Sequence, residues 1–78
     1  MSLTIDGTRI FSNETPVYAE YRPEVAADGG GAWVVVGFRY GGRLFDRDQA
    51  ITAMTIAEEL ERPNPDQALI KSLESELS

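Results

Sequence analysis

The chain has 78 residues, no cysteine, no histidine and a formal net charge of −6 at neutral pH. The length predicts one domain spanning residues 1–78. Without cysteine there are no disulfides or thiolate-bound metals, and without histidine there are no Ser-His-Asp triads or HExxH zinc sites. Because the sequence also shows no nucleophile paired with a base, we expect a protein that is not an enzyme and that uses no cofactor or metal.

Negative charge is concentrated in the C-terminal part of the chain. Residues 48–78 hold seven acids and two bases, whereas residues 1–47 hold six acids and five arginines. An acidic surface repels phosphate backbones, so binding to nucleic acid is disfavoured. The longest apolar run, 32–36, is too short to cross a membrane, and no signal peptide is visible, so we expect a cytoplasmic location.

Alternation of apolar and polar residues predicts an antiparallel β-meander of three to five strands over residues 1–45. The segments 3–5 and 8–11 flank Asp6-Gly7, which predicts either a hairpin or one strand with a bulge at Gly7. Further strands are expected at 17–22 and 32–40.

The pair Gly41-Gly42 predicts a two-residue turn that returns the chain along residues 43–45. In that register Phe38 lies opposite Phe45, and both face the first helix. The same face would carry Val34 and Val36, and the opposite face would carry Trp33, Val35, Arg39 and Leu44. Because both faces are partly apolar, we expect a central strand with packing on each side.

Two helices are predicted after the meander, at 46–62 and 64–77, which gives an α+β fold. Asp46 is expected to cap the first helix in a capping box with Gln49. Asn64 is expected to cap the second helix, with Pro65 in its first position. Glu58 and Glu61 share a face of the first helix and are expected to be solvated.

The apolar residues of the first helix span about 220°, which is wider than one sheet face covers. The second cover is either the C-terminal helix of the same chain or another molecule. The short, stiff link Pro63-Asn64-Pro65 favours docking of the C-terminal helix on a second chain. The sequence therefore predicts a small, non-catalytic interaction protein that binds a second copy of itself, or another protein. The expected interface is formed by Ile56, Leu60, Leu69, Ile70, Leu73 and Leu77.

Two other functions are open from the sequence. The first is an acidic inhibitor or nucleic-acid mimic that binds a basic protein. The second is a nucleic-acid-binding module whose ligand face is formed by Trp33, Arg39 and Arg43, an aromatic side chain and two cations suited to stacking and anion contacts.

A Trp-bearing strand, a glycine turn and Arg43-Leu44-Phe45-Asp46 lead into a helix with Ala50 and Ala53. This stretch, 33–53, resembles the small sheet-plus-helix modules of integrase arm-binding domains. The resemblance implies DNA binding through a basic hairpin, which is represented here by Arg39 and Arg43. The short, acidic, cysteine-free chain with more arginine than lysine is also similar in style to small uncharacterised proteins of actinobacterial phages.

Overall fold

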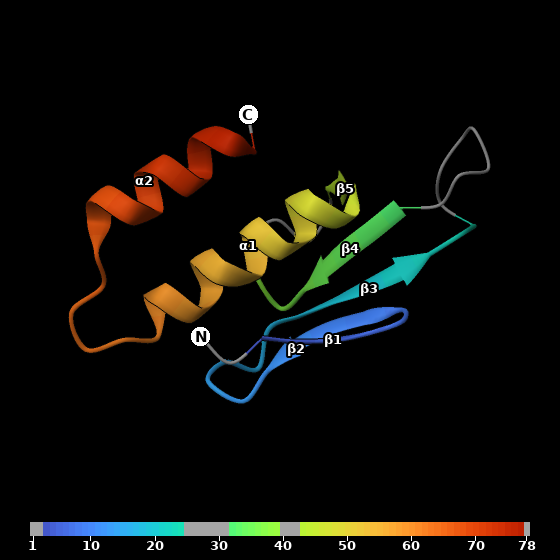
Figure 1. Ribbon diagram of the computed structural model, residues 1–78, viewed down its shortest axis with the longest axis horizontal. Coiled ribbons are helices and arrows are strands. Elements are labelled where there is room, and N and C mark those ends of the chain that lie inside the picture. The colour runs from blue at the N-terminus through green and yellow to red at the C-terminus, as the bar shows by residue number, and fades with distance from the viewer. Residues whose placement is uncertain (1–2, 25–31, 40–42, 78) are drawn as a thin grey trace.

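The computed structural model describes residues 3–24, 32–39 and 43–77 (Figure 1). In this part of the chain an antiparallel five-stranded sheet precedes two helices, so the predicted α+β fold is confirmed. The strands follow one another across the sheet in chain order: β1 (Leu3–Asp6), β2 (Arg9–Ser12), β3 (Tyr18–Arg22), β4 (Ala32–Val36) and β5 (Leu44–Phe45). The helices are α1 (Arg47–Leu60) and α2 (Gln67–Glu76).

The first two strands form a hairpin rather than one bulged strand. Asp6 pairs with Arg9, so the two-residue turn is Gly7-Thr8, one residue later than the expected Asp6-Gly7. Gly7 has a φ of 50°, which is the left-handed region that the first residue of a tight hairpin turn requires.

The predicted register between the last two strands is wrong. Phe45 pairs with Trp33 instead of Phe38, and Leu44 pairs with Val34. Strand β4 ends at Val36, where Gly37 follows with a φ of 83° that no strand residue adopts. The predicted turn at 41–42 lies outside the described residues.

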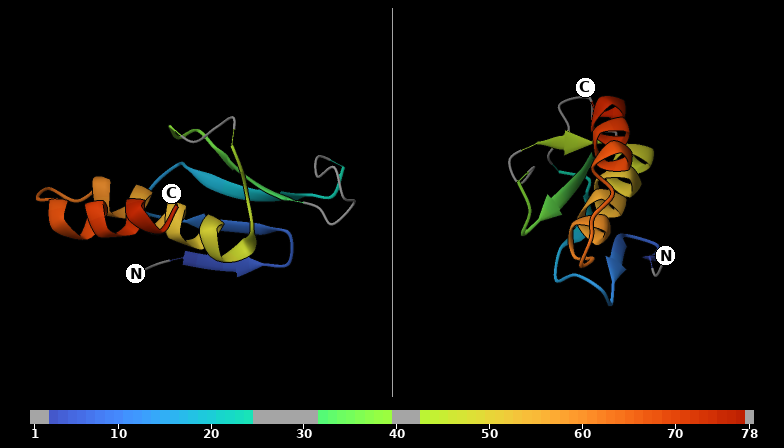
Figure 2. Two further views of the ribbon diagram at one scale, coloured as in Figure 1. Left: turned by 90° about the horizontal axis from the view of Figure 1, so that it is seen from above. Right: turned by 90° about the vertical axis from the view of Figure 1, so that its left-hand side faces the viewer.

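The change of register also exchanges the two faces of β4. Trp33 and Val35 point toward α1 together with Phe45, whereas Val34 and Val36 lie on the other side. We call the side toward α1 the covered face. Its buried residues are Ile10, Ala19, Trp33, Val35 and Phe45, which pack with Ala50, Ala53 and Met54 of α1. Seen end-on, the sheet curves around α1 (Figure 2).

Helix α1 begins as predicted. The Gln49 N–H donates to Asp46 Oδ1 over 2.8 Å, and the Asp46 N–H donates to Gln49 Oε1 over 3.1 Å, which completes the capping box. The prediction that Glu58 is solvated is wrong. This residue is only 2% exposed, and its Oε2 accepts a hydrogen bond from the Ser12 hydroxyl over 2.7 Å. Ser12 lies at the end of β2, so this bond fastens the sheet to the last turns of α1.

Helix α2 folds back on α1 of the same chain, which supplies the second cover that the wide apolar arc of α1 requires. The expectation that the proline-containing link prevents this is wrong, because the cap of α2 is Asp66 and not Asn64. The connection therefore spans 61–66, long enough for a reversal. The carboxylate of Glu59 holds both ends of it: Oε2 accepts from the Asp66 N–H over 2.9 Å, and Oε1 lies 3.2 Å from Arg62 Nε.

Candidate binding surface

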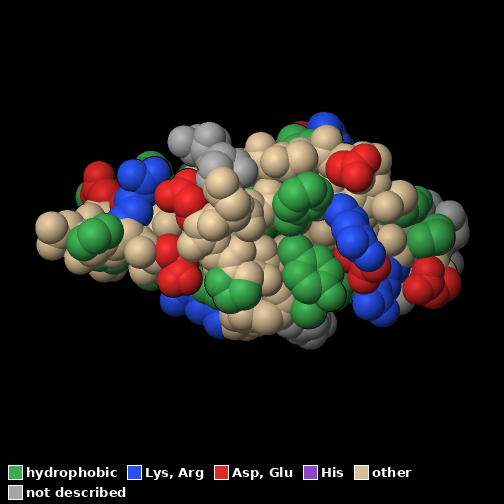
Figure 3. Space-filling model, turned by 90° about the horizontal axis from the view of Figure 1, so that it is seen from below, with side chains coloured by type: hydrophobic (Ala, Val, Ile, Leu, Met, Phe, Trp, Pro, Cys, Tyr) green, Lys and Arg blue, Asp and Glu red, His purple; other side chains and the backbone are tan. Residues whose placement is uncertain are grey.

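The side of the sheet away from α1, which we call the open face, is apolar and uncovered among the described residues. Phe11, Tyr18 and Val36 lie next to one another across β2, β3 and β4. A second row contains Val34 and Leu44. Phe11 is 40% exposed and Leu44 is 50% exposed, whereas the other three are half-buried. Viewed from below, hydrophobic side chains gather near the middle of the molecule (Figure 3).

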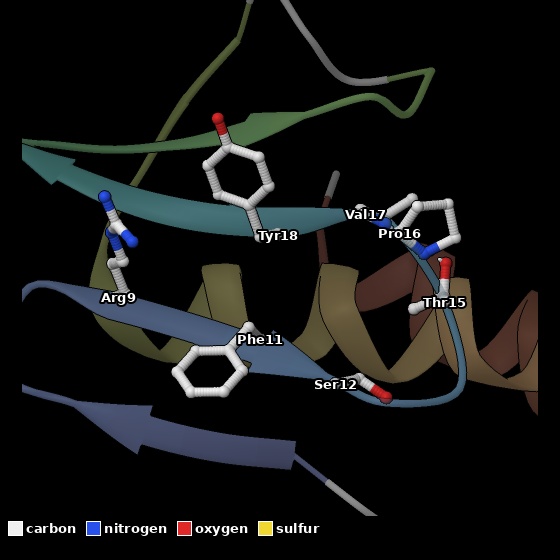
Figure 4. A pocket seen from close by; sticks show the side chains of 7 residues that line it. All are labelled: Arg9, Phe11, Ser12, Thr15, Pro16, Val17 and Tyr18. Atoms are coloured by element: carbon white, nitrogen blue, oxygen red, sulfur yellow. Dashed lines mark hydrogen bonds between the residues drawn. The ribbon is translucent and has the colours of Figure 1, made fainter.

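An open hollow of about 420 Å³ lies at one end of this face. Figure 4 shows that Phe11 and Tyr18 project from the sheet on the side away from α1, with Arg9 next to them on β2. The loop before β3 closes the hollow, and it is fixed because Thr15 is 7% exposed and its Oγ1 accepts from the Val17 N–H over 3.3 Å. The lining residues are Arg9, Phe11, Ser12, Thr15, Pro16, Val17 and Tyr18.

The charges of the open face balance. Two acids and two arginines lie in its rows: Asp6 pairs with Arg9 across the first hairpin, and Arg9 pairs with Glu20 across the next. Glu20 also forms an ion pair of 2.9 Å with Arg22. The excess negative charge of the chain therefore comes from residues outside these rows.

The predicted nucleic-acid face of Trp33, Arg39 and Arg43 does not exist as one surface. Trp33 is 6% exposed and packs in the core, where its ring centroid lies 5.7 Å from that of Tyr21. Arg39 forms an ion pair of 3.1 Å with Glu74 of α2, and Arg43 donates to the carbonyl of Leu77. The tryptophan is thus unavailable for stacking, and both arginines attach the β4–β5 region to α2.

The interface predicted on the helices is largely internal to the chain. Ile56, Ile70 and Leu77 are at most 3% exposed in a single copy, and Leu73 is half-buried against the core. Only Leu60, 37% exposed, and Leu69, 41% exposed, remain on the surface. A second chain is therefore not needed to cover the apolar stripe of α2.

Sequence reasoning missed the open face, although two signals point to it. Ile10 and Phe11 are adjacent large apolar residues, which in a strand must point to opposite sides. In β3 the small Ala19 is on the covered face, where α1 approaches, while the large Tyr18 lies on the other. Both patterns indicate a sheet that is apolar on each side.

Comparisons of the chain with protein-family models, with curated proteins and with solved structures find no match. None of the described helices is long and apolar enough to cross a membrane. Within the described ranges, no group of three or more acidic side chains is placed to hold a metal ion.

Proposed function

We propose that this chain is a small, non-catalytic interaction module that binds a partner protein through the open face of its sheet. The observation that carries the proposal is the row of Phe11, Tyr18 and Val36, which lies uncovered next to an open hollow. Exposed apolar surface costs free energy in water, and on a small protein such a patch marks a site of association.

The chemistry of the surface favours an apolar, nearly neutral region of a partner protein. Phe11 and Tyr18 are aromatic side chains of the kind that dominate the centres of protein interfaces. The acids and arginines around them balance, so the face neither attracts phosphates nor repels an uncharged surface. Arg9, at the margin of the hollow, supplies a donor for a carbonyl or carboxylate of the partner.

The serine and threonine hydroxyl groups that line the hollow are engaged in the fold. The Ser12 hydroxyl donates to the buried Glu58 carboxylate, a contact that fastens the sheet to α1. Thr15 is buried and its hydroxyl accepts a hydrogen bond from the Val17 N–H, so this side chain stabilises the loop before β3.

Site-specific photo-crosslinking in cells of the source organism tests the proposal. A photoreactive phenylalanine analogue replaces Phe11 in one protein and Leu69 in a matched control, since the two side chains are 40% and 41% exposed. We expect position 11 to crosslink a discrete partner that position 69 does not. Leu44→Ser in the same protein should abolish the crosslink, because Leu44 shares the open face.

Two results would refute the open face as the binding site. One is an equal crosslink from both positions, and the other is a crosslink from position 11 that persists with Leu44→Ser. Turnover of a substrate that is lost with Ser12→Ala would refute the non-catalytic assignment.

A further inference from the structure

The hydrogen bonds of β1 are directed by the pairing of its neighbours. The Tyr21 N–H donates to the Thr8 carbonyl over 2.8 Å, so the backbone groups of Thr8 are directed toward β3. Because the direction alternates along a strand, the even-numbered residues of β2 also direct their N–H and C=O groups toward β3. Odd-numbered residues of β2 then point at β1, where they meet Thr4 and Asp6. The backbone groups of Leu3 and Ile5 are consequently directed outward, to the free edge of the sheet.

No strand among the described residues pairs with that edge, which forms the outer margin of the sheet (Figure 2). Edges of this kind are commonly protected by charge, proline or a bulge. β1 has none of these before Asp6, its last residue. Ile5 is moreover 44% exposed, although it pairs with the fully buried Ile10 of β2. The opposite edge, β5, has only two residues and is a poorer template.

We infer that β1 pairs antiparallel with β1 of a second copy of the chain, about a two-fold axis at Thr4. In this register Leu3 of each chain lies opposite Ile5 of the other, and because both present their N–H and C=O outward, each pair forms two hydrogen bonds. A two-fold centred on Ile5 would form only the Ile5 pair within the strand. The axis at Thr4 therefore gives the outward N–H and C=O groups of both Leu3 and Ile5 a hydrogen-bond partner.

The side chains are complementary in the same register. On the side of the sheet that faces the helices, Ile5 of one chain contacts Leu3 of the other, which covers an exposed isoleucine. On the open face the two Thr4 side chains meet at the axis. The two Asp6 carboxylates lie at opposite ends of the paired strands, so no like charges are opposed.

The dimer also joins the two open faces. Thr4 pairs with Phe11, so the row of Phe11, Tyr18 and Val36 continues through Thr4 into the same row of the second copy. The inference concerns an edge that the proposed partner site does not use, so the two are tested separately.

Sedimentation equilibrium of three variants tests the dimer. We expect the wild type at tens of micromolar to have twice the 8.6 kDa of the chain. Ile5→Pro removes an outward N–H without breaking the bonds between β1 and β2, and Ile5→Lys places a charge at the new contact. Each should weaken association at least about tenfold. Leu69→Lys, at a similarly exposed helix residue, should remain dimeric.

Amide hydrogen exchange gives a residue-level readout within β1. Protection of the Leu3 and Ile5 amides should increase with protein concentration, whereas protection of Thr4 and Asp6 should not. Circular dichroism shows whether each variant is folded. If Ile5→Pro fails to fold, Ile5→Lys and the exchange data decide whether β1 forms the dimer contact. A monomeric wild type, a dimer that survives both Ile5 variants, or a dimer dissociated by Leu69→Lys would overturn the inference.

Discussion

The two faces of the sheet are built from the same strands and both carry large apolar side chains, yet only one face is buried. In β2, Ile10 is fully buried while its neighbour Phe11 is 40% exposed. In β5, Phe45 is 3% exposed while its neighbour Leu44 is 50% exposed. The difference comes from the position of α1, which covers one side only. Apolar character alone therefore does not distinguish the residues that hold the fold together from those that are available to a partner.

The largest expected effect compares two adjacent residues of β5. Phe45→Ala should lower the free energy of unfolding by about 3–5 kcal/mol, because it leaves a cavity between Trp33 and α1. Leu44→Ala, on the open face, should lower it by less than about 1 kcal/mol. Urea unfolding of both variants measures the difference. Similar losses would mean that the open face is covered in the free protein.

The next largest effect on stability is expected where α2 packs on α1 of the same chain. Leu77 is 2% exposed, so Leu77→Ala should cost about 2–4 kcal/mol in the free energy of unfolding. Leu69→Ala, at a residue 41% exposed, should cost less than about 1 kcal/mol. Unfolding at several protein concentrations is informative here. A loss at Leu77 that depends on concentration would show that another chain supplies the cover.

A smaller effect is expected at the bond that joins the sheet to the end of α1. Ser12→Ala removes a donor from the buried Glu58 carboxyl group and should cost about 1–3 kcal/mol. Ser75→Ala is the control, since its hydroxyl donates to an exposed carbonyl and its loss should matter by less than about 0.5 kcal/mol. Thermal denaturation of both proteins provides the comparison. Equal melting temperatures would mean that the Ser12 bond contributes nothing.

The smallest effect is expected on the open face itself. Phe11→Thr keeps a good strand former while it removes the aromatic ring, and the free protein should change by less than about 1 kcal/mol. The same substitution should abolish binding of the partner identified by crosslinking. A titration followed by calorimetry measures binding of the partner separately from the stability of the free protein. Lost stability with intact binding would reverse the roles assigned to the two faces.

Much of the architecture is predictable from local patterns. The alternation in the first 45 residues and the capping box of Asp46 with Gln49 are read directly from the sequence, and both are present. The register between β4 and β5 is not predictable in this way. The glycine pair at 41–42 gives a stronger turn signal than the single Gly37, whose positive φ ends the strand.

That one error determines which face of β4 is expected to be covered, because side chains alternate along a strand and an odd shift exchanges the two sides. The site was missed for the same reason: the register placed Val34 and Val36 in the core. The prediction that α2 packs on another chain rested on Asn64 as its cap, whereas the cap is Asp66. Both are good capping residues, and only tertiary contacts decide between them.

The order of the strands has a consequence for how the chain reaches its native state. Each strand pairs with its neighbour in sequence, and α1 follows β5 directly, so the sheet assembles without a crossover or a parallel connection. Short loops close quickly, and rates of folding fall as contacts become more distant along the chain. The hairpins of the meander can therefore form one after another along the chain. The contacts of α1 with β2 form only after the last strand has joined the sheet. We expect the monomer to refold rapidly in a single kinetic phase that precedes any association of two copies.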